Sequence, residues 1–439
     1  MRIFAPLEGG GKAHLADTTL PSAYVEEEFL VSGVGNIYAH DAAGALVVKN
    51  AARPYTTRIL IRRPRDRSQY SGVLVFDLLY PEAGQSTLWP SLRGYIISSR
   101  DAYVQVTTRR EGRNPVLAGT PGAIDQLKLK DSVRYGPIEF PDGGLTWDII
   151  SQIGRLVRTD FPKNPLRDFR PKTIIAGGFS GAGALTLFYI NGGFADKARM
   201  PGGKPIFDGY FVGEPSWYPR VNSTASTALD MADDDPRQQV QPRDVPAISL
   251  YSMWVTTPMG VGRLRADSDA PDDRYRFYVV AGASHVGRTQ LEGEYNSQVA
   301  KCENPPNTFP LNHYIALTFD YLKRWSQGKK IPPHAPPLEL DDRGKPVPDS
   351  NGNPKGGIRS TAVDVPAARH FDGAGGFLCE LTGADQPFSP EKLRELYGSR
   401  AGYVARVAAR TRQLQNEGWL LPESAAEVIS EAEAVKFDR

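Results

Sequence analysis

The sequence predicts an α/β protein built on one mostly parallel sheet with helices on both faces. Short apolar segments of strand length alternate with longer segments of helical periodicity, which is the pattern of parallel strands joined by helices. The chain has 439 residues, of which 40% are hydrophobic and 23% are charged, so it can bury a large core. We therefore expect one large α/β core over residues 1–330. An appended, mainly helical subdomain over residues 331–439 is expected to pack over this core and its pocket.

Strands are predicted over much of the N-terminal third. Apolar residues there alternate with polar residues or form short continuous runs, as in half-buried and buried strands. These segments comprise residues 24–38, 55–64, 71–80 and the end of 94–108. Residues 140–161 instead show helical periodicity through Trp147, Ile150 and Ile153, and we expect Thr146 to cap that helix.

Strands and helices alternate more regularly from residue 172 onward. Strand segments are predicted at residues 172–180, 205–215, 244–252 and 274–285, and helices at residues 183–194 and 313–329. Beyond residue 330 the composition shifts to Pro-rich and turn-rich sequence. The later segment 389–419 is again helical, with Ser389 as the expected cap and Pro390 at the first helical position.

Charge and hydropathy exclude several classes of protein. The formal net charge of +2 arises from 52 basic and 50 acidic residues without long blocks of one sign, so we expect no nucleic-acid surface. The segment 174–190 is uncharged, but it is short for a membrane span and contains four glycines. A strand, a tight turn and a helix explain it better.

The N-terminus and the two cysteines leave two questions open. No apolar segment marks a signal peptide near the N-terminus, so we expect a soluble protein that is either cytoplasmic or a secreted or periplasmic chain after signal removal. Cys302 and Cys379 have no metal-binding spacing. A disulfide and two free thiols are both compatible with the sequence.

Ser180 is the strongest candidate for a catalytic residue. It stands in the segment GGFSGAG between a predicted strand and an apolar helix. A nucleophilic serine in this context sits on a strained turn that only small neighbours allow, and Gly178 and Ala182 are small, although alanine replaces the usual second glycine. The helix N-terminus would direct the backbone N–H of Gly181 toward a developing oxyanion. The alternative is a phosphate-binding loop or a plain tight turn.

His285 is the predicted general base. It closes the segment VVAGASH at the end of the last predicted strand, and the order of serine before histidine agrees with an α/β-hydrolase. The other histidines are expected to be satisfied locally, although His313 opens the closing helix and is a further candidate to approach the site. These five residues are His14, His40, His313, His334 and His370.

Taken together, these motifs resemble a family of large bacterial α/β-hydrolase-domain proteins. The matching segments are YVEEEFLVSGVGNIY, PYTTRILIRRP, GGFSGAGALTLFYINGGF, YRFYVVAGASH, WSQGKKIPPHAPP, GGIRSTAVDVP, LRELYGSRAGYVARV and LLPESA. The resemblance covers almost the whole chain. It implies an α/β-hydrolase fold and esterase activity, with Ser180 in the place of the GxSxSG-like nucleophile elbow and His285 in the place of the late AGxxH histidine.

The acid that should orient His285 is where this sequence departs from the family pattern. The family acid is expected just after AISLYS, but Met253 and two further apolar residues follow Ser252. A buried carboxylate is needed to fix the imidazole tautomer. Our first candidate is Glu214, at the carboxyl end of the preceding strand, and the second is Asp267 or Asp269 in the polar run DSDAPDD. A surface or helix-capping role is the alternative for Glu214.

Further site residues are predicted from their positions after strands. The loop FDLLYPEAG would supply a second oxyanion donor through the backbone N–H of Leu79 or Tyr80, with possible help from the Tyr80 hydroxyl. Trp89, Trp217 and Trp254 follow predicted strand ends and are expected to contact an apolar or ring-bearing substrate group. They could equally contact a lid.

The predicted function is carboxylic ester hydrolysis through an acyl-enzyme on Ser180, with a small-molecule ester as substrate. No metal or organic cofactor is expected, and the oligomeric state is not predicted. Lactone or amide hydrolysis would use the same chemistry. The alternative hypothesis is a non-catalytic binding protein that kept the fold but lost the acid. It is supported by Met253, which stands where the acid is expected.

Overall fold

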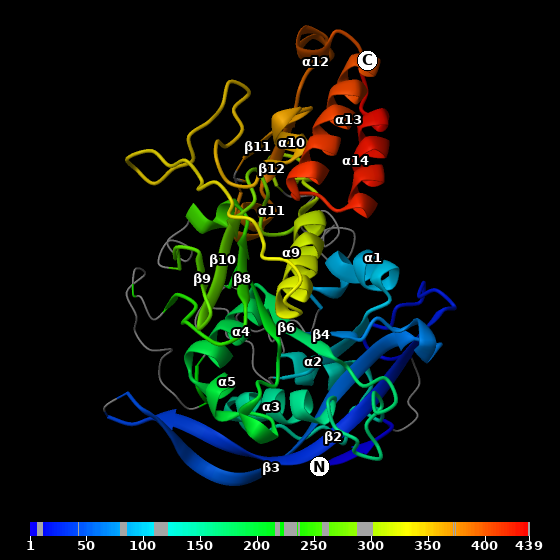
Figure 1. The fold of residues 1–439 in the computed structure, drawn as a ribbon, viewed down its shortest axis with the longest axis vertical. Helices are drawn as coiled ribbons and strands as arrows, with labels where there is room; N and C mark the ends of the chain where they lie inside the picture. The colour runs from blue at the N-terminus through cyan, green and yellow to red at the C-terminus, as the bar shows by residue number, and fades with distance from the viewer. Residues whose placement is uncertain are drawn as a thin grey trace.

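The computed structural model describes most of the chain and is built around one large sheet (Figure 1). The described residues are 1–6, 12–42, 44–79, 86–108, 122–215, 220–223, 235, 238–256, 263–287, 302–371, 373 and 375–437. Within this part, ten strands form the sheet in the order β1-β2-β3-β5-β4-β6-β7-β8-β10-β9. The run from β5 to β10 is parallel, whereas β1, β2, β3 and β9 pair antiparallel. The predicted fold class is confirmed.

The strands of this sheet are β1 (Arg2–Phe4), β2 (Tyr24–His40), β3 (Leu46–Pro64), β4 (Val73–Leu78), β5 (Ala102–Val106), β6 (Thr173–Phe179), β7 (Gly209–Gly213), β8 (Ala247–Tyr251), β9 (Ser268–Ala270) and β10 (Asp273–Val279). The helices before residue 330 are α1 (Trp89–Ser99), α2 (Ala123–Lys130), α3 (Thr146–Leu156), α4 (Gly181–Asn191), α5 (Phe194–Lys197) and α9 (Leu311–Ser326). The C-terminal elements are α10 (Thr361–Asp364), β11 (Ala368–Phe371), α11 (Phe377–Thr382), β12 (Ala384–Pro387), α12 (Pro390–Tyr397), α13 (Arg400–Glu417) and α14 (Pro422–Ala434).

The central strands bury side chains on both faces of the sheet. In β6, Ile174 and Ala176 belong to the hydrophobic core shared with α3 and α4. Ile175 and Phe179 point the other way, into the core shared with α1 and α9. Parallel strands covered on both faces need apolar side chains in both directions, which explains why this segment reads as a continuous apolar run.

The C-terminal region packs against the second of these cores. Ile358 pairs with Val280 in an isolated β-bridge just after β10. Ile358, Val363 and Leu421 all lie in the core shared with α1 and α9. The helices α12, α13 and α14 also enclose a smaller core of their own. Figure 1 shows these helices (orange to red) at one end of the long axis and the β2–β3 ribbon at the other.

Two predictions about helix ends need correction. Thr146 does not cap α3 but is its first residue, and its hydroxyl donates to the Thr108 carbonyl oxygen at 2.6 Å. Asp142 is the capping residue, because its carboxylate accepts from the Gly144 N–H at 2.7 Å and begins a 3₁₀ turn that leads into α3. The helical segment 389–419 is two helices: Ser389 caps α12 as predicted, and Gly398 with a φ of 75° ends it.

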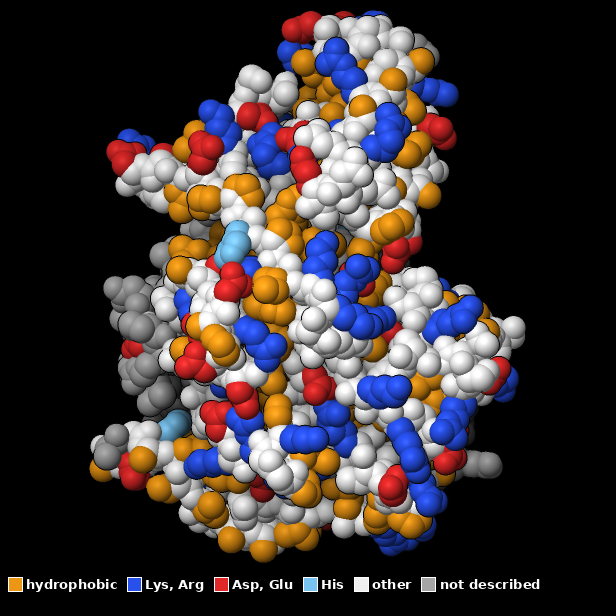
Figure 2. Space-filling model, in the orientation of Figure 1, with side chains coloured by type: hydrophobic (Ala, Val, Ile, Leu, Met, Phe, Trp, Pro, Cys, Tyr) orange, Lys and Arg blue, Asp and Glu red, His pale blue; other side chains and the backbone are white. Residues whose placement is uncertain are grey.

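The charged side chains of one face and the segment 174–190 can be followed in the structure. On the face shown in Figure 2, basic and acidic side chains are interspersed rather than gathered into one basic surface. Residues 174–190 form most of β6, a turn and most of α4, as predicted. Among the described residues, no helix is both long enough and apolar enough to cross a bilayer.

Candidate active site

Ser180 lies on a tight turn between β6 and α4. Its φ of 59° and ψ of −126° are unusual for a residue with a side chain, and such strain costs on the order of 1–3 kcal/mol. The turn brings α4 very close to the sheet, because a Cβ on Gly178 would lie 2.5 Å from the Ala182 backbone. A Cβ on Gly183 would lie 2.2 Å from the Gly213 carbonyl oxygen. Glycine at these two positions therefore allows the strained turn that presents the Ser180 hydroxyl.

His285 reaches Ser180 from the loop that follows β10. Its Nε2 lies 2.9 Å from the Ser180 Oγ, within hydrogen-bond range. The imidazole is mostly buried, and it packs beside Phe179 and Trp254 with ring centroids 5.3 Å apart in each case. These two rings limit the positions that the imidazole can adopt.

Glu214 lies on the other side of the imidazole. Its Oε2 is 3.1 Å from the His285 Nδ1, but the two groups are not aligned as in an ideal hydrogen bond. Among the described residues neither atom has any other hydrogen-bond partner, and Glu214 is fully buried. Hydrogen bonds in empty active sites are often poorly aligned and tighten when substrate binds. The three side chains Ser180, His285 and Glu214 thus form a continuous line of contacts.

The neighbouring strand orients the Glu214 carboxylate. Glu214 directly follows β7, which lies between the strand of Ser180 and β8. The Ser252 hydroxyl, at the end of β8, donates to the Glu214 Oε1 at 2.6 Å. Ser252 therefore stands just before the place where the family pattern led us to expect an acid. In this chain the carboxylate comes from one strand earlier, and the residue after β8 holds it.

The alternative acids lie elsewhere. The Asp267 carboxylate is 2.8 Å from the His334 Nδ1 and also accepts from the Phe277 backbone N–H. Asp269 is 2.6 Å from the Arg276 guanidinium. The structure therefore places neither residue in contact with His285, because both are engaged at the edge strand β9. His313 contacts α14 instead of Ser180, because its Nε2 lies 3.0 Å from the Glu427 carboxylate.

Of the predicted oxyanion donors, Gly181 and Leu79 differ in whether the backbone N–H already has a partner. Gly181 is the first residue of α4, and N–H groups in the first turn of a helix have no partner within the helix. The Leu79 N–H, by contrast, donates to the Val106 carbonyl oxygen at 3.0 Å. This bond argues against Leu79 as the second donor, because its N–H is already used within the sheet. Tyr80 lies outside the described residues.

A cavity of about 460 Å³ opens beside His285. Met253 and Trp254 line one side, and the C-terminal region between residues 346 and 383 lines much of the rest. The Trp254 ring lies 6.0 Å from that of Phe377 in α11. Of the predicted aromatic contacts, Trp254 thus lies at this cavity, whereas Trp217 is outside the described residues.

A disulfide fixes one wall of the cavity. Cys302 and Cys379 are bonded to each other, which decides between the two alternatives that the sequence left open. Cys379 lies in α11, beside the cavity-lining residues Glu380 and Gly383. Cys302 lies further along the chain from His285, ahead of α9. The bond therefore links the segment between the histidine and the closing helix to the C-terminal wall.

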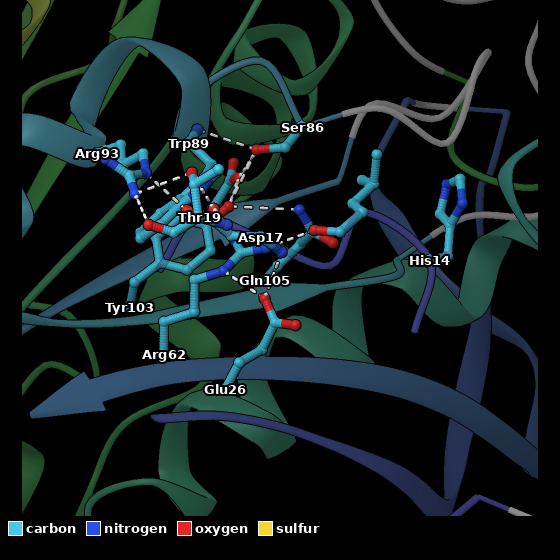
Figure 3. A network of polar contacts seen from close by, with 12 residues as sticks. His14, Asp17, Thr19, Glu26, Arg62, Ser86, Trp89, Arg93, Tyr103 and Gln105 are labelled. Carbon is cyan, nitrogen blue, oxygen red and sulfur yellow. Dashed lines mark hydrogen bonds and ion pairs between the residues drawn. The ribbon is translucent and has the colours of Figure 1, made fainter. Parts of the chain in front are cut away.

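Trp89 is a core residue and not a cavity wall. Its ring stacks under the Arg62 guanidinium, with 4.1 Å from the Arg62 Cζ to the ring centroid, and contacts Tyr103 at 4.9 Å. Figure 3 shows these three side chains gathered beside Ser86. Trp89 does not line the cavity beside His285, so the described residues give no support to the prediction that it contacts substrate. Its position after a strand end is explained instead by the start of α1, which packs its apolar face into the core.

Asp77 is a buried acid near this site that sequence reasoning missed. It lies near the carboxyl end of β4, and its Oδ2 accepts hydrogen bonds from Tyr103 and, at 3.0 Å, from Ser86. Burial raises the pKa of the Asp77 carboxyl to about 7, although both hydrogen bonds and the charge of Arg62 oppose this shift. The only signal in the sequence is an acidic residue inside the apolar strand VLVFDLL.

With this geometry in view, the comparison with known families is decisive for the class of protein. A family model described as alpha/beta hydrolase domain matches residues 4–430, nearly the full chain. The chain therefore belongs to the alpha/beta hydrolase domain family, as the sequence resemblance indicated, and is a member of a family of hydrolases.

Solved structures and curated proteins add little detail. The chain is similar to an esterase from the fungus Rhizomucor miehei, at 11% identity over 69% of this chain and 85% of that one, with a TM-score of 0.34. It is also similar to a Pyrobaculum calidifontis esterase, at 12% identity over 68% of this chain and 87% of that one, with a TM-score of 0.33. No curated protein matches the sequence.

Proposed function

We propose that this protein is a serine hydrolase that cleaves carboxylic esters through an acyl-enzyme on Ser180. The observation that carries the proposal is the contact line from the Ser180 Oγ through both nitrogens of His285 to the Glu214 carboxylate, at 2.9 and 3.1 Å. Nucleophile, base and orienting acid in this geometry define the triad logic of acyl transfer. The strained turn at Ser180 supports the same role.

The first half of the reaction forms the acyl-enzyme. The Ser180 Oγ attacks the ester carbonyl carbon while the His285 Nε2 takes the hydroxyl proton. Negative charge develops on the carbonyl oxygen, where the Gly181 N–H and the N-terminus of α4 stabilise it. The tetrahedral intermediate then collapses. The bond to the alcohol oxygen breaks, and His285 returns its proton to that oxygen.

The second half releases the acid. Water gives a proton to the His285 Nε2 and attacks the acyl carbon, and the Ser180 oxygen leaves with that proton. Glu214 keeps the proton of the neutral imidazole on Nδ1, so that Nε2 can accept, and it stabilises the imidazolium that forms twice per cycle. Ser252 holds the carboxylate in place through its 2.6 Å hydrogen bond.

The alternative hypothesis of a non-catalytic binding protein has less support. It depended on the absence of a carboxylate after β8, but Glu214 lies within 3.1 Å of His285. For the substrate we propose a small ester with an apolar or ring-bearing group, because Trp254 and Phe377 lie at the cavity beside His285.

A panel of p-nitrophenyl esters from acetate to laurate tests the proposal. We expect the wild-type protein to hydrolyse at least one of them, and Ser180→Ala to lower kcat by about a thousandfold or more. The hydroxyl contributes little packing, so the thermal unfolding midpoint of the variant should match that of the wild type. Turnover that survives in Ser180→Ala would remove Ser180 as the nucleophile, and a wild type inert toward every ester would refute the esterase assignment.

A further inference from the structure

A second histidine–carboxylate pair lies in the C-terminal region. The strands β11 and β12 pair antiparallel, and their register places His370 directly opposite Asp385. Side chains that oppose each other in such a pair lie on the same face and can interact. The His370 Nδ1 lies 2.6 Å from the Asp385 Oδ1, and both side chains are mostly buried.

The surroundings of Asp385 fix the direction of this hydrogen bond. Its second oxygen, Oδ2, accepts from the Thr308 backbone N–H at 2.9 Å and from the Thr308 hydroxyl at 2.7 Å. The carboxylate is therefore held as an acceptor toward His370. In the neutral imidazole the proton consequently resides on Nδ1, and Nε2 carries a free lone pair.

His370, whose second ring nitrogen Nε2 is not bound by Asp385, lines the cavity beside the triad. No described residue forms a hydrogen bond with the His370 Nε2, and this atom is not among the fully buried polar atoms that lack a partner. It is therefore accessible, and His370 and His285 line the same cavity of about 460 Å³. The backbone N–H of His370 is also fixed, since it donates to the Asn353 side chain at 2.8 Å.

The position of the cavity indicates which part of an ester would enter it. If the protein acts as proposed above, His285 gives its proton to the leaving alcohol, so the alcohol group lies on the side of His285. The cavity is lined by His285 and not by Ser180, which places it on that side. An alcohol group that extends into it would meet the His370 Nε2.

We propose that His370, oriented by Asp385, is a specificity residue whose Nε2 accepts a hydrogen bond from a hydroxyl on the alcohol part of the ester. This inference rests on the proposed esterase function and narrows its substrate class to esters of hydroxylated alcohols. A buried acceptor selects for a donor because an apolar group in its place leaves the nitrogen unpaired.

Three series of acetate esters test this proposal. The alcohol is a plain alkyl chain, the same chain with one hydroxyl, or the same chain with one keto group, and the substituent is stepped along the chain. All three share one acyl-enzyme, so deacylation is identical and selectivity appears in kcat/KM. We expect the wild type to prefer the best hydroxyalkyl ester over the plain ester by about tenfold or more.

Two variants separate recognition from packing. His370→Phe keeps a ring of similar size but removes the acceptor, and we expect the ratio of its kcat/KM for the hydroxyalkyl ester to its kcat/KM for the plain ester to fall to about one. Asp385→Asn is nearly isosteric. Its amide oxygen would stay on Thr308, so its NH₂ group would donate to Nδ1 and move the imidazole proton to Nε2. This variant should prefer the keto ester, which a purely structural role would not produce.

His334→Phe is the matched control, because His334 also contacts carboxylates but does not line the cavity, and its selectivity should equal that of the wild type. A wild type that hydrolyses the plain esters without preference for a hydroxyl, or a His370→Phe protein that retains the preference, would overturn the inference and leave the esterase function intact. A wild type that cleaves no ester in any series would overturn both.

Discussion

At the residue scale, the surroundings of Glu214, Asp267 and Asp269 distinguish which of these carboxylates can orient His285. Glu214 is fully buried, and its Oε2 lies 3.1 Å from the His285 Nδ1. Asp267 and Asp269 are bound by Arg276 and His334 at the edge of the sheet. Both aspartates are therefore engaged by residues other than His285. The sequence could rank these candidates by strand position, but it could not show which were paired.

Glu214→Gln tests the role of this carboxylate. The amide keeps the shape of the side chain, but it removes the charge that stabilises the imidazolium and can donate to Nδ1, which favours the wrong tautomer. We expect kcat for the best ester to fall by about a hundredfold to ten-thousandfold. Asp267→Asn is the control and should retain wild-type kcat. Equal activity of Glu214→Gln and the wild type would exclude Glu214 from the triad.

At the scale of elements, the segment that carries the nucleophile was the easiest to predict. The strand β6 and the helix α4 follow from an apolar run, a small-residue turn and a helix that ends at Gly192. The helix α1 was missed, because Gly94 and a β-branched end lower the helix propensity of its sequence. It is stabilised by packing of Leu92 and Ile96 into the core, a tertiary effect that local sequence does not reveal.

Asp77 links the end of β4 to Ser86, which lies just before α1. Its carboxyl lies near the end of β4 and accepts from Ser86, whose Oγ in turn accepts from the Trp89 N–H at 2.9 Å. Figure 3 shows Ser86 between Trp89 and Tyr103 in this network.

The raised pKa of Asp77 predicts a pH-dependent contribution to stability. The folded-state pKa of about 7 exceeds the unfolded value of about 3.9. The stability that depends on the protonated Asp77 carboxyl is therefore fully present below the unfolded pKa and is lost as pH rises through 7. Asp77→Asn resembles the protonated form. Relative to the wild type, its free energy of unfolding should therefore rise by about 2 kcal/mol between roughly pH 5 and pH 8.

Urea unfolding of both proteins across this pH range measures the difference. The exposed Asp168→Asn variant is the control, since Asp168 lies at the surface, and its curve should follow the wild type. A constant difference between Asp77→Asn and the wild type at all pH values would show that the carboxyl does not titrate as its burial implies.

At the scale of the whole molecule, the two halves of the chain share one core. Ile358, Val363 and Leu421 pack with residues of α1 and α9, and the C-terminal region lines the cavity beside His285. The sequence marked the boundary near residue 330 through its composition. It also predicted that the appended region packs over the core and its pocket, but it did not show which residues meet there, because contacts between residues distant in sequence leave no local pattern. We propose that residues 331–439 belong to the same folding and functional unit.

Removal of residues 331–439 tests this unity. The truncation would expose the apolar core face under α9 and open the cavity, so we expect insoluble protein or loss of ester hydrolysis. Solubility and activity after expression of both forms provide the measurement. A soluble truncated protein with full activity would show that the C-terminal region is a separate module.

Covalent labelling with a fluorophosphonate, followed by peptide mass spectrometry, tests the central claim most directly, because the reagent reacts only with an activated serine and requires no knowledge of the substrate. We predict that the folded wild type is labelled at Ser180, that Ser180→Ala takes up no label, and that His285→Ala is labelled far more slowly. A folded wild-type protein that stays unlabelled, or a label found on a different residue, would contradict the account of Ser180, His285 and Glu214 as a working triad.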